Sequence, residues 1–455
     1  MGAGARGDAE EREAAIPGDG VTVLHRFEAF LRGSYGWVAP ALAAGGWTLW
    51  SYLRLRPPRS VTAHHLAAYE RWSWHHLSYS DVLHLYRVHA LYNHAAPYIH
   101  TAIEYPVLTG LFMWVAAWFP GVQGYFAASA AGLGICVIVS VWLLYRSAPR
   151  RAWIFALSPL LVFYALLNWD MLAIALMLLG WDAYRRRRYL LAGVWLSAGT
   201  FAKLFPAVLL LFCAAELWGE ERSAQTRKGR VAAPAAGRVA APPEGSAARR
   251  NLVRLLGGSV AFAAVVNLPF VALNPVKWGD FYSFNATRHD TSGILYELHI
   301  VSGWPIAGFD ALIAVLVGGF AAFFIWRVLH RRATAEVAAA ATFTFFILLN
   351  KTFSPQYMVW ILVFGLMAGW PGWTYAGIMV AGLVDFVDAS ITFTLIQSYS
   401  RAWSWYWTEV YHLNLALRNS SIAVALAGAL WDSRSQRCRL PRLQTSRLRS
   451  SGSED

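Results

Sequence analysis

The sequence has few charged side chains. Only 14% of its 455 residues are Asp, Glu, Lys or Arg, whereas an average soluble domain has about a quarter. Hydrophobic residues make up 57%, and the mean hydropathy is +0.39. This composition excludes an ordinary soluble globular protein. It predicts instead that most of the chain lies in a lipid bilayer.

Cysteine and lysine are also scarce. Two of the three cysteines, Cys136 and Cys213, fall in apolar segments and the third, Cys438, in a basic tail, so neither a disulfide framework nor a metal motif is expected. Lysine occurs only at positions 203, 228, 277 and 351. The N-terminus is acidic over 8–13 and lacks the basic-then-apolar order of a cleavable signal peptide, so we expect none.

Long apolar segments fill most of the remaining sequence. A membrane-spanning helix needs about 20 consecutive apolar residues, and we expect an all-α polytopic membrane protein with about 10–13 transmembrane or re-entrant segments. The candidates are 35–53, 123–145, 189–202, 204–218, 252–273, 305–326, 335–349, 356–370, 373–395 and 413–431, with shorter or broken ones at 105–119, 152–167 and 170–183.

The net charge of +13 is concentrated in three places: 185–188, the segment 219–250, and the C-terminal tail. The positive-inside rule places such clusters in the cytoplasm, which favours topology and contact with anionic lipids over nucleic-acid binding. The first long loop is then extracytoplasmic. An outer Glu104 and an inner Arg150 are incompatible if 105–119 and 123–145 both cross, so one segment must be re-entrant or broken.

These features divide the chain into five parts. The segment 219–250 has repeats of Ala, Gly, Pro and Arg and is predicted to be a disordered cytoplasmic linker. The parts are a cytoplasmic N-terminus (1–34), an N-terminal membrane half (35–218) with the outer loop 54–104, the linker (219–250), a C-terminal membrane half (251–431) and a basic cytoplasmic tail (432–455).

Four sets of polar residues are predicted to share the outer side. They are Asp81 and Glu104 in the first loop, Asn168 with Asp170, Lys203, and Lys351. Lysine is a compact cation suited to contact a phosphate group. Two ammonium groups beside a carboxylate at headgroup depth fit a lipid-phosphate leaving group and an attacking hydroxyl.

Each of these residues also has a structural interpretation. Asp81 could be a helix cap or a solvated charge, and Glu104 a carboxylate favoured at a helix N-terminus. A lysine at a helix end often extends to the interface, which would explain Lys203 and Lys351 without chemistry. The stretch 69–85, rich in Trp and His, is predicted to be one amphipathic helix lying on the outer leaflet.

The first loop is unusually rich in histidine. Asp81 and His84 are spaced to share one helical face, and His with carboxylate can bind divalent metals. No recognisable ligand motif is present, and we expect no metal or other cofactor. Eight of the thirteen histidines lie in this loop, at positions 64, 65, 75, 76, 84, 89, 94 and 100.

Asp385 and Asp388 support a different hypothesis. Both lie within the apolar segment 373–395, and a charge inside a span is by default a functional candidate. They could form a proton or ion path in a transporter or lipid flippase. An inverted repeat would favour that function, but the two halves differ in loop length and motif content. A non-catalytic scaffold would leave the clustered outer motifs unexplained.

Taken in order, the motifs resemble those of the polyprenyl-phosphate-sugar glycosyltransferases of family 87, integral membrane enzymes of the GT-C class. The similarity covers roughly 35–430. Its elements are Tyr-Ser-Asp at 79–81, Glu-Tyr-Pro at 104–106, Asn-Trp-Asp at 168–170, Ala-Lys-Leu-Phe-Pro at 202–206, and Asn-Lys-Thr-Phe-Ser-Pro-Gln-Tyr at 350–357 followed by Trp360.

The resemblance implies a GT-C-type helical bundle whose first long outer loop carries the catalytic acid. Asp81 then matches the general base and Glu104 the acid of the Glu-Tyr-Pro element. Lys203 and Lys351 match the family's lysines. We expect Lys203, Lys351, Arg288 and Gln356 to contact the donor phosphate, and Asn168, Asp170, Tyr105 and Tyr357 to contact the substrate. The family's middle motif more often reads Gly-Gln-x-Asp, so the role of Asn168 is the least supported.

The expected reaction is transfer of a sugar, with inversion, from a polyprenyl-phosphate donor to a lipid or glycan acceptor. Mannose is expected from the family alone, and arabinose or glucose stay open. The donor, the acceptor and membrane lipids are the expected partners, and nucleic acid is not. The cell membrane is the expected location, with the endoplasmic reticulum as the alternative.

Overall fold

The computed structural model describes residues 35–230, 244–288, 292–398 and 401–435. Within these ranges the regular structure is helical, and the backbone pairing outside helices is one isolated bridge between Pro97 and Thr101. Among the described residues, five helices are long and apolar enough to cross a membrane. They are α6 (Gly121–Ser147), α12 (Glu244–Leu273), α15 (Ile306–Leu329), α18 (Gly372–Gln397) and the run that ends in α20 (His412–Ser435). The prediction of an all-α polytopic membrane protein is confirmed.

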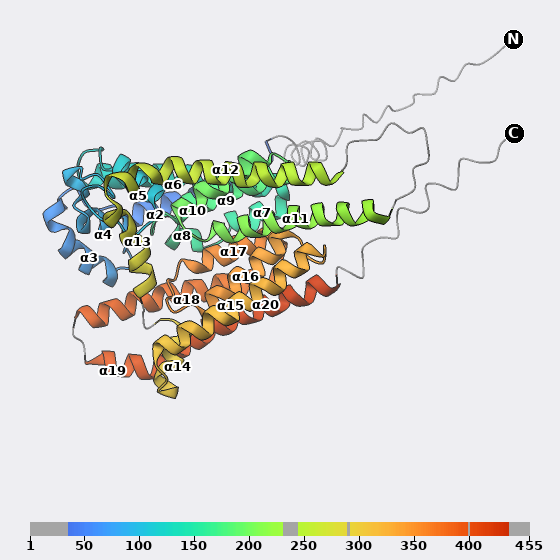
Figure 1. Cartoon of the computed structure of the whole chain (residues 1–455). Helices are drawn as coiled ribbons and strands as arrows, with labels where there is room; N and C mark the ends of the chain where they lie inside the picture. Colours follow the sequence, from blue (N-terminus) through green and yellow to red (C-terminus); the bar gives the residue numbers. More distant parts are fainter. Residues whose placement is uncertain (1–34, 231–243, 289–291, 399–400, 436–455) are drawn as a thin grey trace, which may run out of the picture.

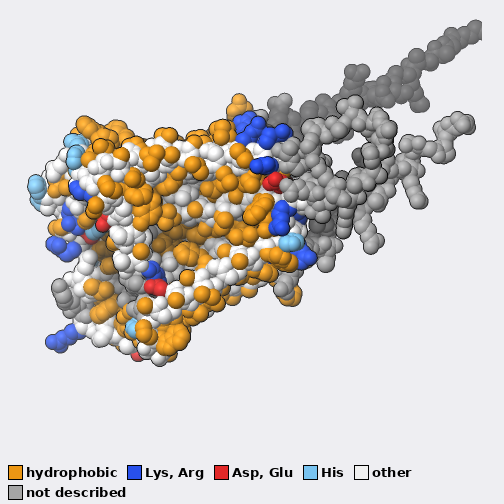
Figure 2. All heavy atoms as spheres, in the orientation of Figure 1, with side chains coloured by type: hydrophobic (Ala, Val, Ile, Leu, Met, Phe, Trp, Pro, Cys, Tyr) orange, Lys and Arg blue, Asp and Glu red, His pale blue; other side chains and the backbone are white. Residues whose placement is uncertain are grey.

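The long helices lie side by side along one axis, and several short helices gather at one end (Figure 1). We call this the first-loop end, because α3 (Leu66–His75) and α4 (Asp81–Val88) lie there. Hydrophobic side chains cover the middle of the visible surface, and most Lys and Arg side chains lie toward its two ends (Figure 2). That distribution is expected of a protein whose middle is surrounded by lipid.

The first loop follows α2 (Val38–Leu55) and contains two helices instead of one. The predicted single interfacial helix over 69–85 is therefore wrong. Its backbone is interrupted at Leu77, where φ is 53°, a left-handed value that an α-helix does not accommodate. Helix α3 ends at His75, and α4 begins afresh at Asp81 with Ser80 as its N-cap.

Helix α5 (Val107–Ala116) explains the conflict in the predicted topology. At about 1.5 Å per residue it is only half as long as a bilayer core is thick. The indole Nε1 of Trp114, near its end, donates to the carbonyl of His94 at 3.2 Å. Gln123, at the start of α6, donates to the carbonyl of Pro58 at 2.7 Å. Both ends of α5 thus lie at the first-loop end, and α6 makes the crossing.

The next segment is broken, as its proline predicted. Helix α7 (Pro149–Ala156) and helix α8 (Leu160–Tyr164) are separated at Pro159. The Tyr164 hydroxyl donates to the carbonyl of Gly382 in α18 at 2.6 Å. Irregular backbone at membrane depth is tolerated where protein buries it, and this segment returns the chain to the first-loop end.

Several of the remaining helices agree closely with predicted segments, namely α9 (Asp170–Arg185), α10 (Tyr189–Ala202), α16 (Ala335–Leu349) and α17 (Tyr357–Ala368). Helix α11 (Pro206–Arg230) starts in its predicted segment and continues beyond it. Outside the predicted segments lie α13 (Pro275–Thr287), α14 (Ile294–Ser302), α19 (Ala402–Tyr406) and the π-helical turn Trp407–Tyr411 that leads into α20. Helices α11 and α12 extend into the predicted linker, so the intervening segment is shorter than expected. Its remainder, 231–243, lies outside the described residues, as do 1–34 and 436–455.

Glycine allows α10 and α12 to approach closely. A Cβ on Gly193 would lie 2.0 Å from the carbonyl oxygen of Leu255, and one on Gly258 would lie 2.3 Å from that of Leu190. Small residues at such crossings are typical of membrane helices, since they permit backbone-to-backbone packing. This packing fixes the end of α10, and with it the position of Lys203.

Candidate functional site

Asp81 is held in place by the turn that precedes α9. Its backbone N–H donates to the carbonyl of Leu167 at 2.8 Å. The hydroxyl of Ser80 donates to the carbonyl of Leu166 at 2.8 Å and accepts from the N–H of Val82, which caps α4. The first residue of α4 is therefore attached to a segment that lies more than eighty residues away in the sequence.

Titratable groups from several segments surround the Asp81 carboxylate. Tyr79 shares a side-chain hydrogen bond with it, and the charges of Lys203, His84 and Glu104 act on it. Burial raises the pKa of Asp81, and the hydrogen bond from Tyr79 and the positive charges of Lys203 and His84 offset this only in part, so the pKa stays above its ordinary value. A carboxylate with a raised pKa is a better proton acceptor.

Lys203 forms an ion pair with Asp170, the first residue of α9. The ammonium nitrogen lies 4.9 Å from the ring centroid of Tyr105 and 5.0 Å from that of Trp360. Cation–π contacts of this kind stabilise a desolvated ammonium group. The side chain of Lys203 is 14% exposed and that of Asp170 only 1%, so Lys203 is the member of the pair that reaches the surface.

The side chain of Asn168 makes a hydrogen bond to the backbone. Its side-chain oxygen accepts from the N–H of Asp170 at 3.0 Å, and the residue is fully buried. An Asn two residues before the start of a helix commonly makes this turn. The structure therefore assigns Asn168 to the positioning of Asp170, and the substrate contact implied by the resemblance is not apparent in its geometry.

The Glu-Tyr-Pro turn is held from two sides. The buried hydroxyl of Tyr98 contacts the carbonyl oxygens of Tyr105 at 2.7 Å and Pro106 at 2.9 Å. Thr109, one turn into α5, donates to the carbonyl of Ala202 at 2.7 Å. Since Ala202 precedes Lys203, this bond fixes the first loop and the end of α10 relative to one another.

Glu104 has a partner of its own. Its carboxylate lies 2.9 Å from Nε2 of His89. Burial raises the pKa of Glu104, but the hydrogen bond and charge of His89 outweigh burial and leave the pKa below its ordinary value. Of the two carboxylates, Asp81 therefore has the higher pKa and is the stronger proton acceptor when both are ionised.

Four of the predicted site residues meet around Tyr105. The charges of Asp81, Asp170 and Glu104 all act on its hydroxyl. Lys203 lies over its ring. We call Asp81, Glu104, Tyr105, Asp170 and Lys203 the Asp81 cluster. Tyr357 borders it, because its hydroxyl acts on that of Tyr105 and its ring lies 4.3 Å from that of Trp360.

Two of the other predicted phosphate contacts have partners outside this cluster. The ammonium group of Lys351 donates to the carbonyl of Ala286 at 2.6 Å and lies 3.9 Å from the carboxylate of Asp310. The guanidinium carbon of Arg288, an exposed residue, lies 5.7 Å from the ring centroid of Phe284. Gln356 is buried at the N-terminus of α17. Lys351 and Lys203 thus have different carboxylate partners.

The two aspartates in α18 are enclosed. Asp385 forms an ion pair with Arg418 of α20 at 2.8 Å, and the two side chains are 3% and 2% exposed. Arg418 also donates to the carbonyl of Ser292, and its guanidinium carbon lies 3.7 Å from the ring centroid of Phe353. Asp388 accepts a hydrogen bond from Tyr406. These contacts give both aspartates a structural role in joining α18 to its neighbours.

Several of these contacts were not predicted from the sequence. Trp360 and Tyr79 were named only as the last and first residues of motifs, and neither was given a role in the site. Arg418 is a single charge in the apolar segment 413–431, and that alone should have predicted a buried partner. Glu70 gave no local signal, because its partners are defined only when α3 folds against α4.

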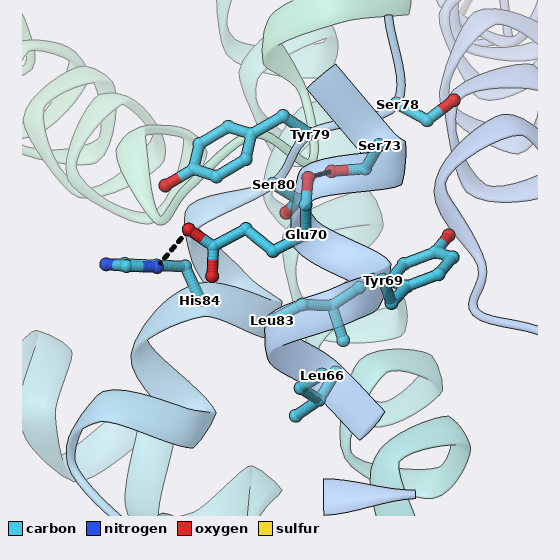
Figure 3. Close-up of a pocket in the computed structure, with 9 residues that line it drawn as sticks. All are labelled: Leu66, Tyr69, Glu70, Ser73, Ser78, Tyr79, Ser80, Leu83 and His84. Atoms are coloured by element: carbon cyan, nitrogen blue, oxygen red, sulfur yellow. Dashed lines mark hydrogen bonds and ion pairs between the residues drawn. The ribbon is translucent and has the colours of Figure 1, made fainter. Parts of the chain in front are cut away.

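A narrow pocket lies beside the cluster, between α3 and α4 (Figure 3). The polar ends of Tyr79, Glu70 and His84 lie together on one side of it, and Leu66 and Leu83 on another. Figure 3 also shows the ion pair between Nδ1 of His84 and Glu70, at 2.9 Å. The full lining is Leu66, Tyr69, Glu70, Ser73, Ser78, Tyr79, Ser80, Leu83 and His84.

Comparison of the chain with protein-family models, with curated proteins and with solved structures gave no match. In the part of the chain that the structure describes, no group of three or more His, Cys, Asp or Glu side chains is arranged to hold a metal ion. The site is therefore interpreted from its own geometry.

Proposed function

We propose that the chain is a membrane glycosyltransferase of the GT-C type that uses a polyprenyl-phosphate sugar as donor. The observation that carries the proposal is the Asp81 cluster, in which a basic carboxylate and a partly exposed ammonium group from distant segments meet at one end of a membrane bundle. A base and a cation are the two groups that displacement of a phosphate by a hydroxyl requires.

In the proposed reaction the Asp81 carboxylate accepts the proton of an acceptor hydroxyl. The hydroxyl oxygen forms a bond to the anomeric carbon from one side, and the bond between that carbon and the phosphate oxygen breaks on the other. The bonding electrons leave with the phosphate, and Lys203 stabilises its charge. The configuration at the anomeric carbon is thereby inverted, and no metal is required.

Lys203 can serve this role while it is paired. An ammonium group has three N–H donors, and Asp170 accepts from one of them. The aromatic faces of Tyr105 and Trp360 fix the direction of the side chain without adding negative charge. A preorganised donor of this kind stabilises developing negative charge more than a mobile one does.

The alternative of a transporter or flippase has less support. Its candidate coupling groups are Asp385, which is enclosed in an ion pair with Arg418, and Asp388, which accepts a hydrogen bond from Tyr406. Breaking a buried pair by removing one partner is costly, which favours a structural function for Asp385. We further propose mannose as the sugar, a lipid or glycan as the acceptor, and the cell membrane as the location. The endoplasmic reticulum stays the second candidate location.

The test is transfer from radiolabelled polyprenyl-phosphate-mannose to lipid acceptors by the full-length protein in proteoliposomes. Asp81→Asn is expected to reduce transfer by about 10²–10⁴-fold, the usual contribution of a general base. Asp182→Asn is the matched control, because that carboxylate pairs with Arg186 on the surface. Retained transfer in Asp81→Asn would remove the assignment of the base.

The pH dependence gives a second readout. Only the ionised carboxylate accepts a proton, so transfer should decline as the pH falls through the pKa of Asp81. Because that pKa is raised, the decline should begin at a higher pH than for an ordinary carboxyl group. A rate that is flat across this range would contradict the role of Asp81.

A further inference from the structure

Helix α4 presents a second titratable side chain beside the proposed base. Asp81 and His84 are one turn apart, a spacing that places both on the same face of a helix. The ring of His84 lies 6.1 Å from that of Tyr79, centroid to centroid, and Tyr79 shares a hydrogen bond with Asp81. His84 therefore belongs to the immediate surroundings of the carboxylate.

The orientation of His84 is fixed by Glu70 of α3. Nδ1 of His84 lies 2.9 Å from Oε1 of Glu70, and Nη2 of Arg87 lies 2.9 Å from Oε2 of the same carboxylate. Glu70 thus holds two side chains of α4 at once (Figure 3 shows the contact with His84). A carboxylate that accepts from Nδ1 fixes the imidazole and favours its charged form.

We propose that Glu70 and His84 are positioning residues for Asp81: Glu70 holds a charged imidazole beside the carboxylate and so keeps Asp81 in the ionised form that accepts a proton. This inference rests on the proposed function, since Asp81 needs to be ionised only if it is a base. It assigns a purpose to the pocket between α3 and α4, which the reaction itself does not use.

The surrounding charges set the direction of the effect. Asp81 faces Tyr79, His84, Glu104, Tyr105, Asp170 and Lys203, and His84 faces Glu70, Asp81, Arg87 and Glu104. The hydrogen bond to Glu70 raises the pKa of His84 more than burial lowers it, so the ring stays charged to a higher pH than a free histidine. The positive charge of His84 in turn lowers the pKa of Asp81.

The first test is the pH profile of kcat/KM in His84→Gln. Loss of the imidazolium should raise the pKa of Asp81 and move the acid limb to higher pH. A shift of half a pH unit corresponds to about a threefold lower kcat/KM on the acid limb. On the alkaline plateau, kcat/KM of the variant should equal that of the wild type. His84→Lys, which retains a positive charge, should restore the position of the limb.

His76→Gln is the matched control, because His76 is an exposed histidine at the end of α3 that stacks on Trp72. It should leave the profile unchanged. A loss in His84→Gln that is equal at every pH would indicate a merely structural side chain and overturn the proposal. Thermal unfolding of each variant shows whether the fold is retained.

The second test does not depend on transfer. The pKa of His84 is followed by NMR in the full-length protein in nanodiscs, labelled with ¹³C-histidine and assigned with His84→Gln. Both Glu70→Gln and Asp81→Asn should lower that pKa, since coupling between two titrating groups is reciprocal. A His84 pKa that changes by less than about half a unit in Asp81→Asn would overturn the inference. Absence of transfer in the wild type, with this coupling intact, would instead reject the proposed function alone.

Discussion

Two ion pairs, Lys203–Asp170 and Arg418–Asp385, have the same chemistry but differ in the exposure of the cation. In each pair an almost fully buried aspartate contacts a cation from a different segment: Lys203 at the C-terminal end of α10, or Arg418 within α20. In the first pair the cation is 14% exposed, and in the second only 2%. The exposure of the cation therefore distinguishes a group that can meet a substrate from one that only joins helices.

Their surroundings differ in the same way. Lys203 has one carboxylate partner and two aromatic faces, and it also acts on Asp81. Arg418 contacts Asp385, the carbonyl of Ser292 and the ring of Phe353. The planar guanidinium is suited to several fixed partners, whereas a compact ammonium is suited to a point contact with phosphate. The difference suggests a site at Lys203 and a structural joint at Arg418.

The largest effect is expected from Asp385→Ala. It leaves Arg418 buried without its carboxylate, and breaking a buried pair in this way costs about 3–5 kcal/mol. Thermal unfolding in detergent should show a clear fall in Tm. The double variant Asp385→Leu with Arg418→Met removes both charges and should recover most of the stability. An unchanged Tm in the single variant would show that the pair is not a structural joint.

Lys203→Met should have the next largest effect, a loss of about 10²–10³-fold in transfer, as for removal of one donor to a developing anion. Lys277→Met is the control, because that partly exposed lysine donates to the carbonyl of His100 at the same end of the molecule. Adding Asp170→Asn to Lys203→Met should restore thermal stability but not transfer. If the double variant recovered both thermal stability and transfer, Lys203 would have only a structural role.

Lys351→Met is expected to reduce transfer by less than about tenfold. Lys351 is partly exposed and contacts Asp310 and the carbonyl of Ala286, and such pairs contribute about 0–1 kcal/mol. The same proteoliposome assay measures it alongside Lys203→Met. Equal losses in the two variants would show that Lys351 reaches the donor phosphate during the reaction, as we expected from the sequence.

The smallest effect should follow Phe353→Leu, which removes the ring beneath the Arg418 guanidinium. A desolvated cation–π contact contributes about 0.5–2 kcal/mol, so Tm should fall by less than in Asp385→Ala, with transfer largely retained. Phe346→Leu serves as the control because Phe346 is exposed on α16. Similar changes in the two variants would indicate only the loss of an aromatic side chain.

Much of the fold was predictable from local pattern. The predicted segments 189–202 and 335–349 coincide with α10 and α16, and the short segment 105–119 proved too short to cross. Hydropathy and length determine such elements because each membrane helix satisfies its own backbone. The break at Leu77 was not predictable in this way, since nothing in an amphipathic pattern excludes a turn where α3 packs back onto α4.

The candidate site was predictable only in part. The order of polar motifs placed Asp81 and Lys203 on one side of the membrane, and the structure brings both into one cluster. The same reasoning placed Lys351 there, but the structure pairs it with Asp310. The side of the membrane on which a residue lies follows from the order of the spans along the chain. It does not determine which residues on that side are neighbours.

Composition and segment length are enough to predict a helical membrane protein with its polar motifs in the connections, because burial of apolar side chains in lipid depends on these two properties. Which charges become partners depends on how the helices pack. Asp170 pairs with Lys203, Asp385 with Arg418, and Glu70 with His84. Pairs of this kind depend on distances between segments that are remote in the chain, and those distances exist only once the helices have packed.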